Sequence, residues 1–241
     1  MAVLISILKA KLNFIYEDFF KQIGVNKDTG LLNLNPSIKF AAYPYIGSKY
    51  GTKIKILVVG LDIGSDESIN KIMDYNERRH IIEDKDISKY NPHIAGTYIS
   101  ALYFLKETMD WNSSWIKVKN ISTCQKTLKK KYLLPKDNPL SYISFTNYYK
   151  FVTINRTKRT GGENRRYLDK KLEEDLLMQE VDILKPDIII FQGKQFFSNK
   201  YNELILKLKK VTSTIFICPH PSYRGKGKRE PEYFIQQFKK I

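Results

Sequence analysis

Cysteine, histidine and acidic residues are scarce in this chain of 241 residues. The two cysteines, Cys124 and Cys218, are too few and too isolated for a disulfide framework or a metal knuckle, so we expect a reducing, cytoplasmic setting. Only 25 acidic residues stand against 41 basic ones, which leaves a net charge of +16. Such an excess attracts polyanions, of which nucleic acid is the commonest. The competing interpretation is a lysine-rich codon bias.

Long apolar runs are also missing. No run reaches the length of a membrane span, and the apolar start of the chain has neither a preceding basic residue nor a small-residue cleavage site. We therefore expect no membrane segment and no signal peptide. Internal repeats, low-complexity linkers and a convincing domain boundary are absent as well. We expect residues 1–241 to form one domain, and we take the protein to be a monomer.

Shorter apolar runs do occur, and they alternate with helical patterns. Near-continuous runs of Ile, Leu, Val and Phe predict buried strands at residues 53–64, 141–151, 187–193 and 213–222. Helical spacing predicts helices at residues 3–23, 95–109, 124–132, 165–185, 195–209 and 230–240. Residues 24–53, broken by Gly and Pro, are expected to be an irregular connection. The alternation predicts an α/β domain with three layers and a central, largely parallel sheet.

Polar residues follow each of the four predicted strands. Asp62, Asn147, Gln192 and His220 come at or just after the strand ends, and His220 is one of only three histidines. In open α/β sheets, functional groups gather at the carboxyl ends of the strands. We therefore expect an acid, an amide, the glycine turn at Gln192-Gly193 and a histidine to meet at one edge of the sheet.

Four segments resemble, in the same order, motifs of the uracil-DNA glycosylase superfamily. They are VVGLDIG (58–64), FTNYYKF (145–151), PDIIIFQGKQFF (186–197) and PHPSYRG (219–225). The layout is most similar to the iron–sulfur and mismatch-specific types. The resemblance implies a uracil-DNA glycosylase-like fold and DNA as the partner.

The sequence departs from those motifs at three positions. Ile63 replaces a proline, Leu61 stands where the iron–sulfur type has a catalytic glutamate, and Phe151 stands where that type has a cluster cysteine. We therefore expect no iron–sulfur centre, no other cofactor and no metal. Asp62 is left as the acid of the first motif that could act on water.

The resemblance assigns roles that suit cleavage of an N-glycosidic bond. A carboxylate, Asp62, would stabilise an oxocarbenium-like sugar and orient water. An imidazole, His220, would donate a hydrogen bond to the departing base. Asn147 would read a pyrimidine edge, and His93 or Tyr98 would stack on the base. The competing interpretations are a loop aspartate, a turn histidine, a turn asparagine and core aromatic residues.

Gly64 bears on the substrate. Common uracil-specific enzymes have a tyrosine at this position, and its ring excludes substituents at carbon 5 of the pyrimidine. A glycine removes that wall. The resemblance therefore implies either 5-substituted cytosine of phage DNA, hydroxymethylated or glucosylated and attacked in antiviral defence, or plain uracil.

Two basic, glycine-containing stretches are candidates for contact with DNA phosphates. The residues of the first stretch are Arg156, Lys158, Arg159, Arg165 and Arg166. Those of the second stretch are Ser222, Tyr223, Arg224, Lys226 and Lys228. Tyr223 or Arg224 would be the wedge that fills the space left by the base. Solvated surface loops are the alternative.

Two other functions fit parts of the sequence. Pro186-Asp187 followed by Gln192-Gly193-Lys194, with Asp66 and Glu67, superficially resembles the magnesium site of a metal-dependent nuclease. The spacing argues against it, because both halves would lie on one short strand. A chain with degenerate motifs could also be a non-catalytic DNA-binding module.

Overall fold

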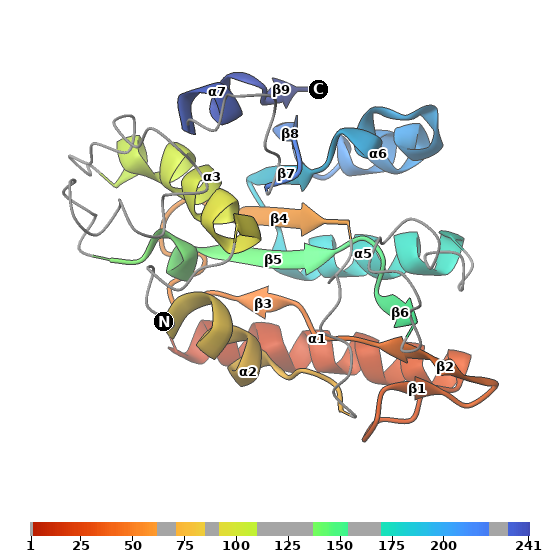
Figure 1. Ribbon diagram of the computed structural model, residues 1–241. Coiled ribbons are helices and arrows are strands. Elements are labelled where there is room, and N and C mark those ends of the chain that lie inside the picture. The colour runs from red at the N-terminus through yellow and green to blue at the C-terminus, as the bar shows by residue number, and fades with distance from the viewer. Residues whose placement is uncertain (1, 62–70, 85–91, 110–136, 154–169, 222–230) are drawn as a thin grey trace.

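The fold is organised around a mixed sheet of six strands in the order β3-β5-β4-β7-β8-β9 (Figure 1). The computed structural model describes residues 2–61, 71–84, 92–109, 137–153, 170–221 and 231–241. The inner strands are β5 (Ile143–Asn147), β4 (Ile56–Gly60), β7 (Ile188–Gln192) and β8 (Ile215–Cys218), and they run parallel. The edge strands β3 (Tyr45–Ile46) and β9 (Lys239–Lys240) are antiparallel to their neighbours. The prediction of an α/β fold with a largely parallel sheet is confirmed.

Helices cover both faces of this sheet. Helices α1 (Ala2–Ile23), α5 (Lys170–Leu184) and α6 (Asn202–Leu208) pack on the face that carries Leu57, Val59 and Ile189, which we call the α5 face. Helices α3 (Pro92–Thr108) and α7 (Pro231–Gln236) pack on the opposite face, the α3 face, which carries Ile56 and Val58. Burial on both faces explains why the strand sequences are apolar at nearly every position.

The strand order reverses at β4, which lies between β5 and β7. The chain passes from β4 to β5 through α3 on one face, and from β7, the other neighbour of β4, to β8 through α6 on the opposite face. Connections that leave adjacent strands toward opposite faces separate from one another at the carboxyl edge. Ligands of open α/β sheets bind at such a point.

The N-terminal third differs from the expectation for residues 24–53. In place of an irregular connection, β1 (Leu31–Leu32), β2 (Asn35–Phe40) and β6 (Phe151–Thr153) form a second, antiparallel sheet. Phe40 of β2 pairs with Phe151 of β6, and their rings lie 5.7 Å apart. The prediction was wrong because this pairing joins segments that are far apart in sequence.

The predicted strand 141–151 was also wrong as a single element. A 3-10 turn (Pro139–Tyr142) precedes β5, β5 ends at Asn147, and Phe151 begins β6 in the other sheet. Phe151, at the position of a cluster cysteine in the iron–sulfur type, therefore packs between Phe19 and Phe40 in the core.

The helices predicted at 3–23 and 95–109 are confirmed as α1 and α3, and the part of the helix predicted at 165–185 that the structure describes is confirmed as α5. The segment predicted as a helix at 195–209 begins as two 3-10 turns, and α6 starts at Asn202. The last helix ends at Gln236 and is followed by β9. The predicted helix at 124–132 lies outside the described residues. None of the described helices combines the length and apolarity that a membrane crossing requires.

Candidate functional site

The last residues of the four parallel strands form one row at the carboxyl edge. Asn147 is in register with Gly60, and Gln192 is in register with Cys218. Side chains alternate between the two faces along a strand, and Ile188, Ile190 and Cys218 pack in the core of the α3 face. Asn147, Gly60 and Gln192 therefore also belong to the α3 face of the row.

Asn147 is the most unusual member of this row. Its side chain is 3% exposed, and Oδ1 has no hydrogen-bond partner within the described part of the chain. A Cβ atom added to Gly60 would lie 2.7 Å from this oxygen, so the glycine allows the amide to lean across β4. A buried acceptor without a partner costs about 1–3 kcal/mol. Such an atom marks a place where a ligand can supply the missing donor.

Gln192 at the end of β7 is held by helix α3. The side chain is 1% exposed, and Nε2 donates to Oγ1 of Thr97 at 3.0 Å. The Thr97 hydroxyl in turn donates to the carbonyl oxygen of His93 at 3.0 Å. These bonds attach the first turns of α3 to the carboxyl edge of the sheet.

His220 lies two residues beyond β8 and meets His93 of α3. The ring centroids are 4.8 Å apart and the rings are nearly perpendicular. Gly96 makes this approach possible, because a Cβ atom there would lie 2.6 Å from the carbonyl oxygen of Pro221. The structure therefore brings together two sequence-predicted residues that are 127 positions apart, namely half-buried His220 and exposed His93.

The two predicted stacking residues have different environments. Tyr98 is 2% exposed and packs in the core of the α3 face, whereas His93 lies at the surface. Of the two, His93 is the candidate that a ligand can reach.

Asp62 and Gly64 lie outside the described residues, but the backbone that leads to them is described. The amide of Tyr148 donates to the carbonyl oxygen of Gly60 at 2.8 Å, and the amide of Tyr149 donates to that of Leu61 at 2.8 Å. The chain therefore runs beside the segment that follows Asn147 until one residue before Asp62. The predicted phosphate-contacting residues also lie outside the described part of the chain. They are Arg156, Lys158, Arg159, Arg165, Arg166, Ser222, Tyr223, Arg224, Lys226 and Lys228.

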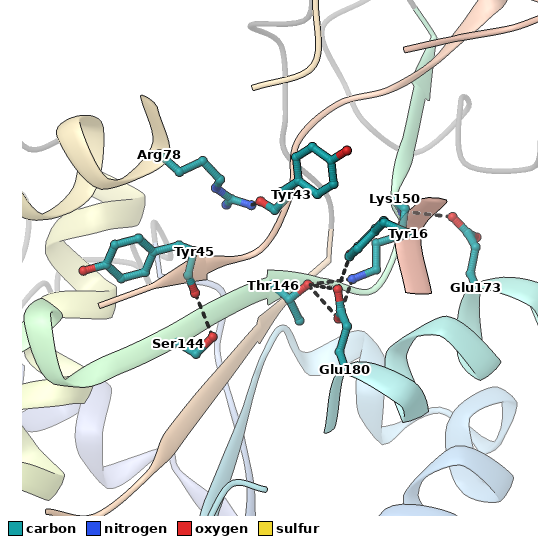
Figure 2. Close-up of polar contacts among 9 residues, drawn as sticks. All are labelled: Tyr16, Tyr43, Tyr45, Arg78, Ser144, Thr146, Lys150, Glu173 and Glu180. Carbon is teal, nitrogen blue, oxygen red and sulfur yellow. Dashed lines mark hydrogen bonds and ion pairs between the residues drawn. The ribbon is translucent and has the colours of Figure 1, made fainter. Parts of the chain in front are cut away.

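On the opposite face, a buried polar network holds the same strand end (Figure 2). Nζ of Lys150 donates to Oε2 of Glu180 at 2.7 Å and to Oγ1 of Thr146 at 2.6 Å. The Thr146 hydroxyl bonds to Glu180 at 2.9 Å, and the Tyr16 hydroxyl donates to the other carboxylate oxygen. Thr146 and Lys150 lie on either side of Asn147 in the sequence, so the network fixes the backbone that carries the amide.

Burial shifts the ionisation of this network. Desolvation lowers the pKa of Lys150, and the neighbouring Glu180 carboxylate opposes that shift. The backbone amide of Lys150 donates to Oε1 of Glu173 at 2.9 Å (Figure 2). Burial nevertheless raises the pKa of Glu173 to about 7, because desolvation outweighs that hydrogen bond.

A metal site has little support among the described residues. They contain no group of three or more His, Cys, Asp or Glu side chains placed to hold an ion. Asp187 precedes β7, where Oδ2 accepts from the amide of Lys55 at 2.8 Å, whereas Gln192 ends the same strand. The two halves of the nuclease-like pattern therefore lie at opposite edges of the sheet. Burial also raises the pKa of the Cys218 thiol, which makes it a poor ligand.

Sequence reasoning missed three residues of this site, namely Gly60, Thr97 and Phe145. The period of two along a strand places Phe145 on the same face as Asn147, and that signal was available in FTN. Thr97 and Gly60 become meaningful only once α3 and β4 are placed beside Gln192 and Asn147. Comparison of the chain with models of known protein families, with curated proteins and with solved structures gives no match.

Proposed function

We propose that this protein is a monofunctional DNA glycosylase of the uracil-DNA glycosylase superfamily. It would flip a pyrimidine out of DNA and hydrolyse the N-glycosidic bond, which leaves an abasic site. The observation that carries the proposal is the buried Asn147 amide, whose Oδ1 has no partner within the described residues and lies beside Gly60 at the end of β4, the strand at which the order reverses. A pyrimidine edge offers the donor that this oxygen lacks.

The residues around the amide suit the bond cleavage. Asp62, which follows the end of β4 by two residues, would orient water toward the anomeric carbon and stabilise the positive charge on the sugar. His220, held against His93, would donate a hydrogen bond to the base as the bond electrons move onto it. A pre-positioned donor is worth more there than in water because no reorganisation is needed.

The net charge of +16 supports DNA as the partner, since each neutralised phosphate releases counterions. The substrate we propose is a 5-substituted cytosine, hydroxymethylated or glucosylated, or uracil. Gly64 favours the substituted base because a glycine leaves room beside carbon 5.

A non-catalytic DNA-binding module is the second candidate. The departures Ile63 and Leu61 in the first motif favour it, because they remove residues that the resembling enzymes use. The nuclease is disfavoured by the position of Asp187 at the far edge of the sheet.

Release of free base from duplex DNA tests the proposal. Duplexes that carry uracil, hypoxanthine, 5-hydroxymethylcytosine or its glucosylated form are incubated with the protein in EDTA, and the free base is measured by mass spectrometry. We expect release of a pyrimidine by the wild type and none by Asp62→Asn, which should still bind the DNA. Tight binding without release of any base would support the binding module, and strand cleavage only with magnesium would support the nuclease.

A further inference from the structure

Phe145 lies beside the Asn147 amide on the α3 face. Strand alternation places the two side chains on the same face of β5. A Cβ atom added to Gly60 would come within 3.0 Å of Cζ of Phe145, as well as within 2.7 Å of Oδ1 of Asn147. The ring and the amide therefore lie together over the backbone of Gly60, and a larger residue there would displace them.

The Phe145 ring is half-buried and is held by a buried cation. Cζ of Arg78 lies 5.2 Å from the ring centroid. Arg78 is itself 6% exposed, and Nη1 donates to the carbonyl oxygen of Tyr43 at 2.7 Å (Figure 2). A guanidinium anchored in this way restrains the ring through a cation–π contact. A ring that is already ordered loses little conformational entropy when a flat ligand stacks on it.

The other two aromatic candidates have different surroundings. Tyr98 is enclosed by the core, and His93 already contacts His220. Phe145, in contrast, is half-buried and lies next to a buried polar atom that has no partner in the described residues.

We propose that Phe145 is the ring on which the extruded pyrimidine stacks, with Asn147 bonded to the edge of the base. Oδ1 of Asn147 would accept from N3–H of uracil or from the amino group of cytosine. Stacking combined with edge hydrogen bonds is how enzymes hold a flipped base. The DNA context of this inference rests on the proposed function, whereas the recognition of a pyrimidine ring can be tested separately.

The test is a titration with 5-fluorouracil and 5-fluorocytosine followed by ¹⁹F NMR. The variants are Phe145→Leu, Phe145→Tyr and the matched control Phe104→Leu. Phe104 is also half-buried in the core of the α3 face, where its ring lies 4.9 Å from that of Phe216. We expect Phe145→Leu to weaken binding by about fivefold or more, the effect of losing one base–aromatic stack. Phe145→Tyr, which keeps an aromatic ring, should bind more tightly than Phe145→Leu, and Phe104→Leu should bind as the wild type does.

A second measurement covers the case in which Phe145→Leu does not fold. In wild-type protein with ¹³C-labelled phenylalanine rings, the signal that is missing from Phe145→Tyr should move during the titration, and the signal missing from Phe104→Leu should not. Equal binding by Phe145→Leu and Phe104→Leu, or an unmoved Phe145 signal, would overturn the inference.

Release of base from DNA separates this inference from the proposed function. If the wild type binds the fluorinated bases through Phe145 but releases no base from DNA, the inference is supported and the glycosylase proposal is contradicted. If the wild type releases base from DNA and Phe145→Leu leaves its KM unchanged, the glycosylase proposal is supported and the inference about Phe145 is contradicted. If the wild type neither binds the fluorinated bases nor releases base from DNA, both proposals are contradicted.

Discussion

The two faces of one strand end use polar side chains in opposite ways. On the α5 face, Thr146 and Lys150 are bonded to Glu180 in a network whose members are all partnered. On the α3 face, Asn147 presents a buried oxygen without a partner within the described residues. Buried charges whose hydrogen bonds are all made hold a fold in one arrangement, whereas a buried acceptor without a donor can bond to a ligand. The difference is consistent with the α5 face positioning the strand end, and the proposed function places the base-binding site on the α3 face.

The largest expected effect comes from disrupting the buried polar network on the α5 face. Glu180→Ala leaves the Lys150 ammonium buried without its carboxylate, so the free energy of unfolding should fall by about 3–5 kcal/mol. Urea unfolding measures it. The double variant Lys150→Met/Glu180→Leu should recover much of the loss, because neither charge is then buried alone.

Glu203→Ala is the matched control, since Glu203 pairs with Lys207 at 3.4 Å on the exposed side of α6. Its effect should stay below about 1 kcal/mol. A loss in Glu180→Ala no larger than in this control would contradict a structural role for the network.

The next effect is pH dependence from Glu173. Because burial raises its folded pKa to about 7 from 4.5, the folded protein binds the extra proton between these values. The contribution of this group to the free energy of unfolding is therefore greatest below pH 4.5 and falls as the pH rises toward 7. The total fall is up to about 3 kcal/mol, and above pH 7 the contribution stays constant. Glu173→Gln should flatten the profile and be more stable than the wild type at pH 8. Parallel profiles of the two proteins in urea unfolding between pH 5 and pH 8 would refute the assignment.

On the α3 face we expect a smaller change in the free energy of unfolding, together with a loss of activity. Asn147→Ala removes an acceptor that has no partner to lose, so stability should change by no more than about 1 kcal/mol. Base release under single-turnover conditions should fall on the order of a hundredfold, as when a transition-state hydrogen bond is removed. Loss of stability without loss of release would reverse the proposed roles of the two faces.

The smallest effect concerns the histidine pair. His93→Ala removes the ring that lies against His220, so the imidazole gains freedom and base release should fall by about tenfold through misalignment. Tyr98→Phe keeps the core packing and should leave the rate unchanged. A larger effect of Tyr98→Phe than of His93→Ala would restore Tyr98 as the functional residue.

Much of the central sheet was predictable, because few folds other than a parallel sheet covered by helices can bury near-continuous apolar strands that alternate with helices. The second sheet was not, since β2 and β6 are short and pair across more than a hundred residues. At the site, the strand ends identified Asn147 and His220, yet the partners of those residues depend on register and on close approach at Gly60 and Gly96. The network of Lys150 with Glu180 joins a strand to a helix that no local pattern links.

The most direct test follows the Asn147 side-chain amide by ¹⁵N NMR, with its signal assigned from Asn147→Asp. The ligand is a duplex that carries 2′-fluoro-2′-deoxyuridine or its cytidine counterpart, in which fluorine disfavours the positive sugar and preserves the glycosidic bond. We expect the Asn147 side-chain signal to shift strongly, while the backbone amide of Lys150, bonded to Glu173 on the other face, moves little. A shift at Lys150 with an unchanged Asn147 signal would contradict the account.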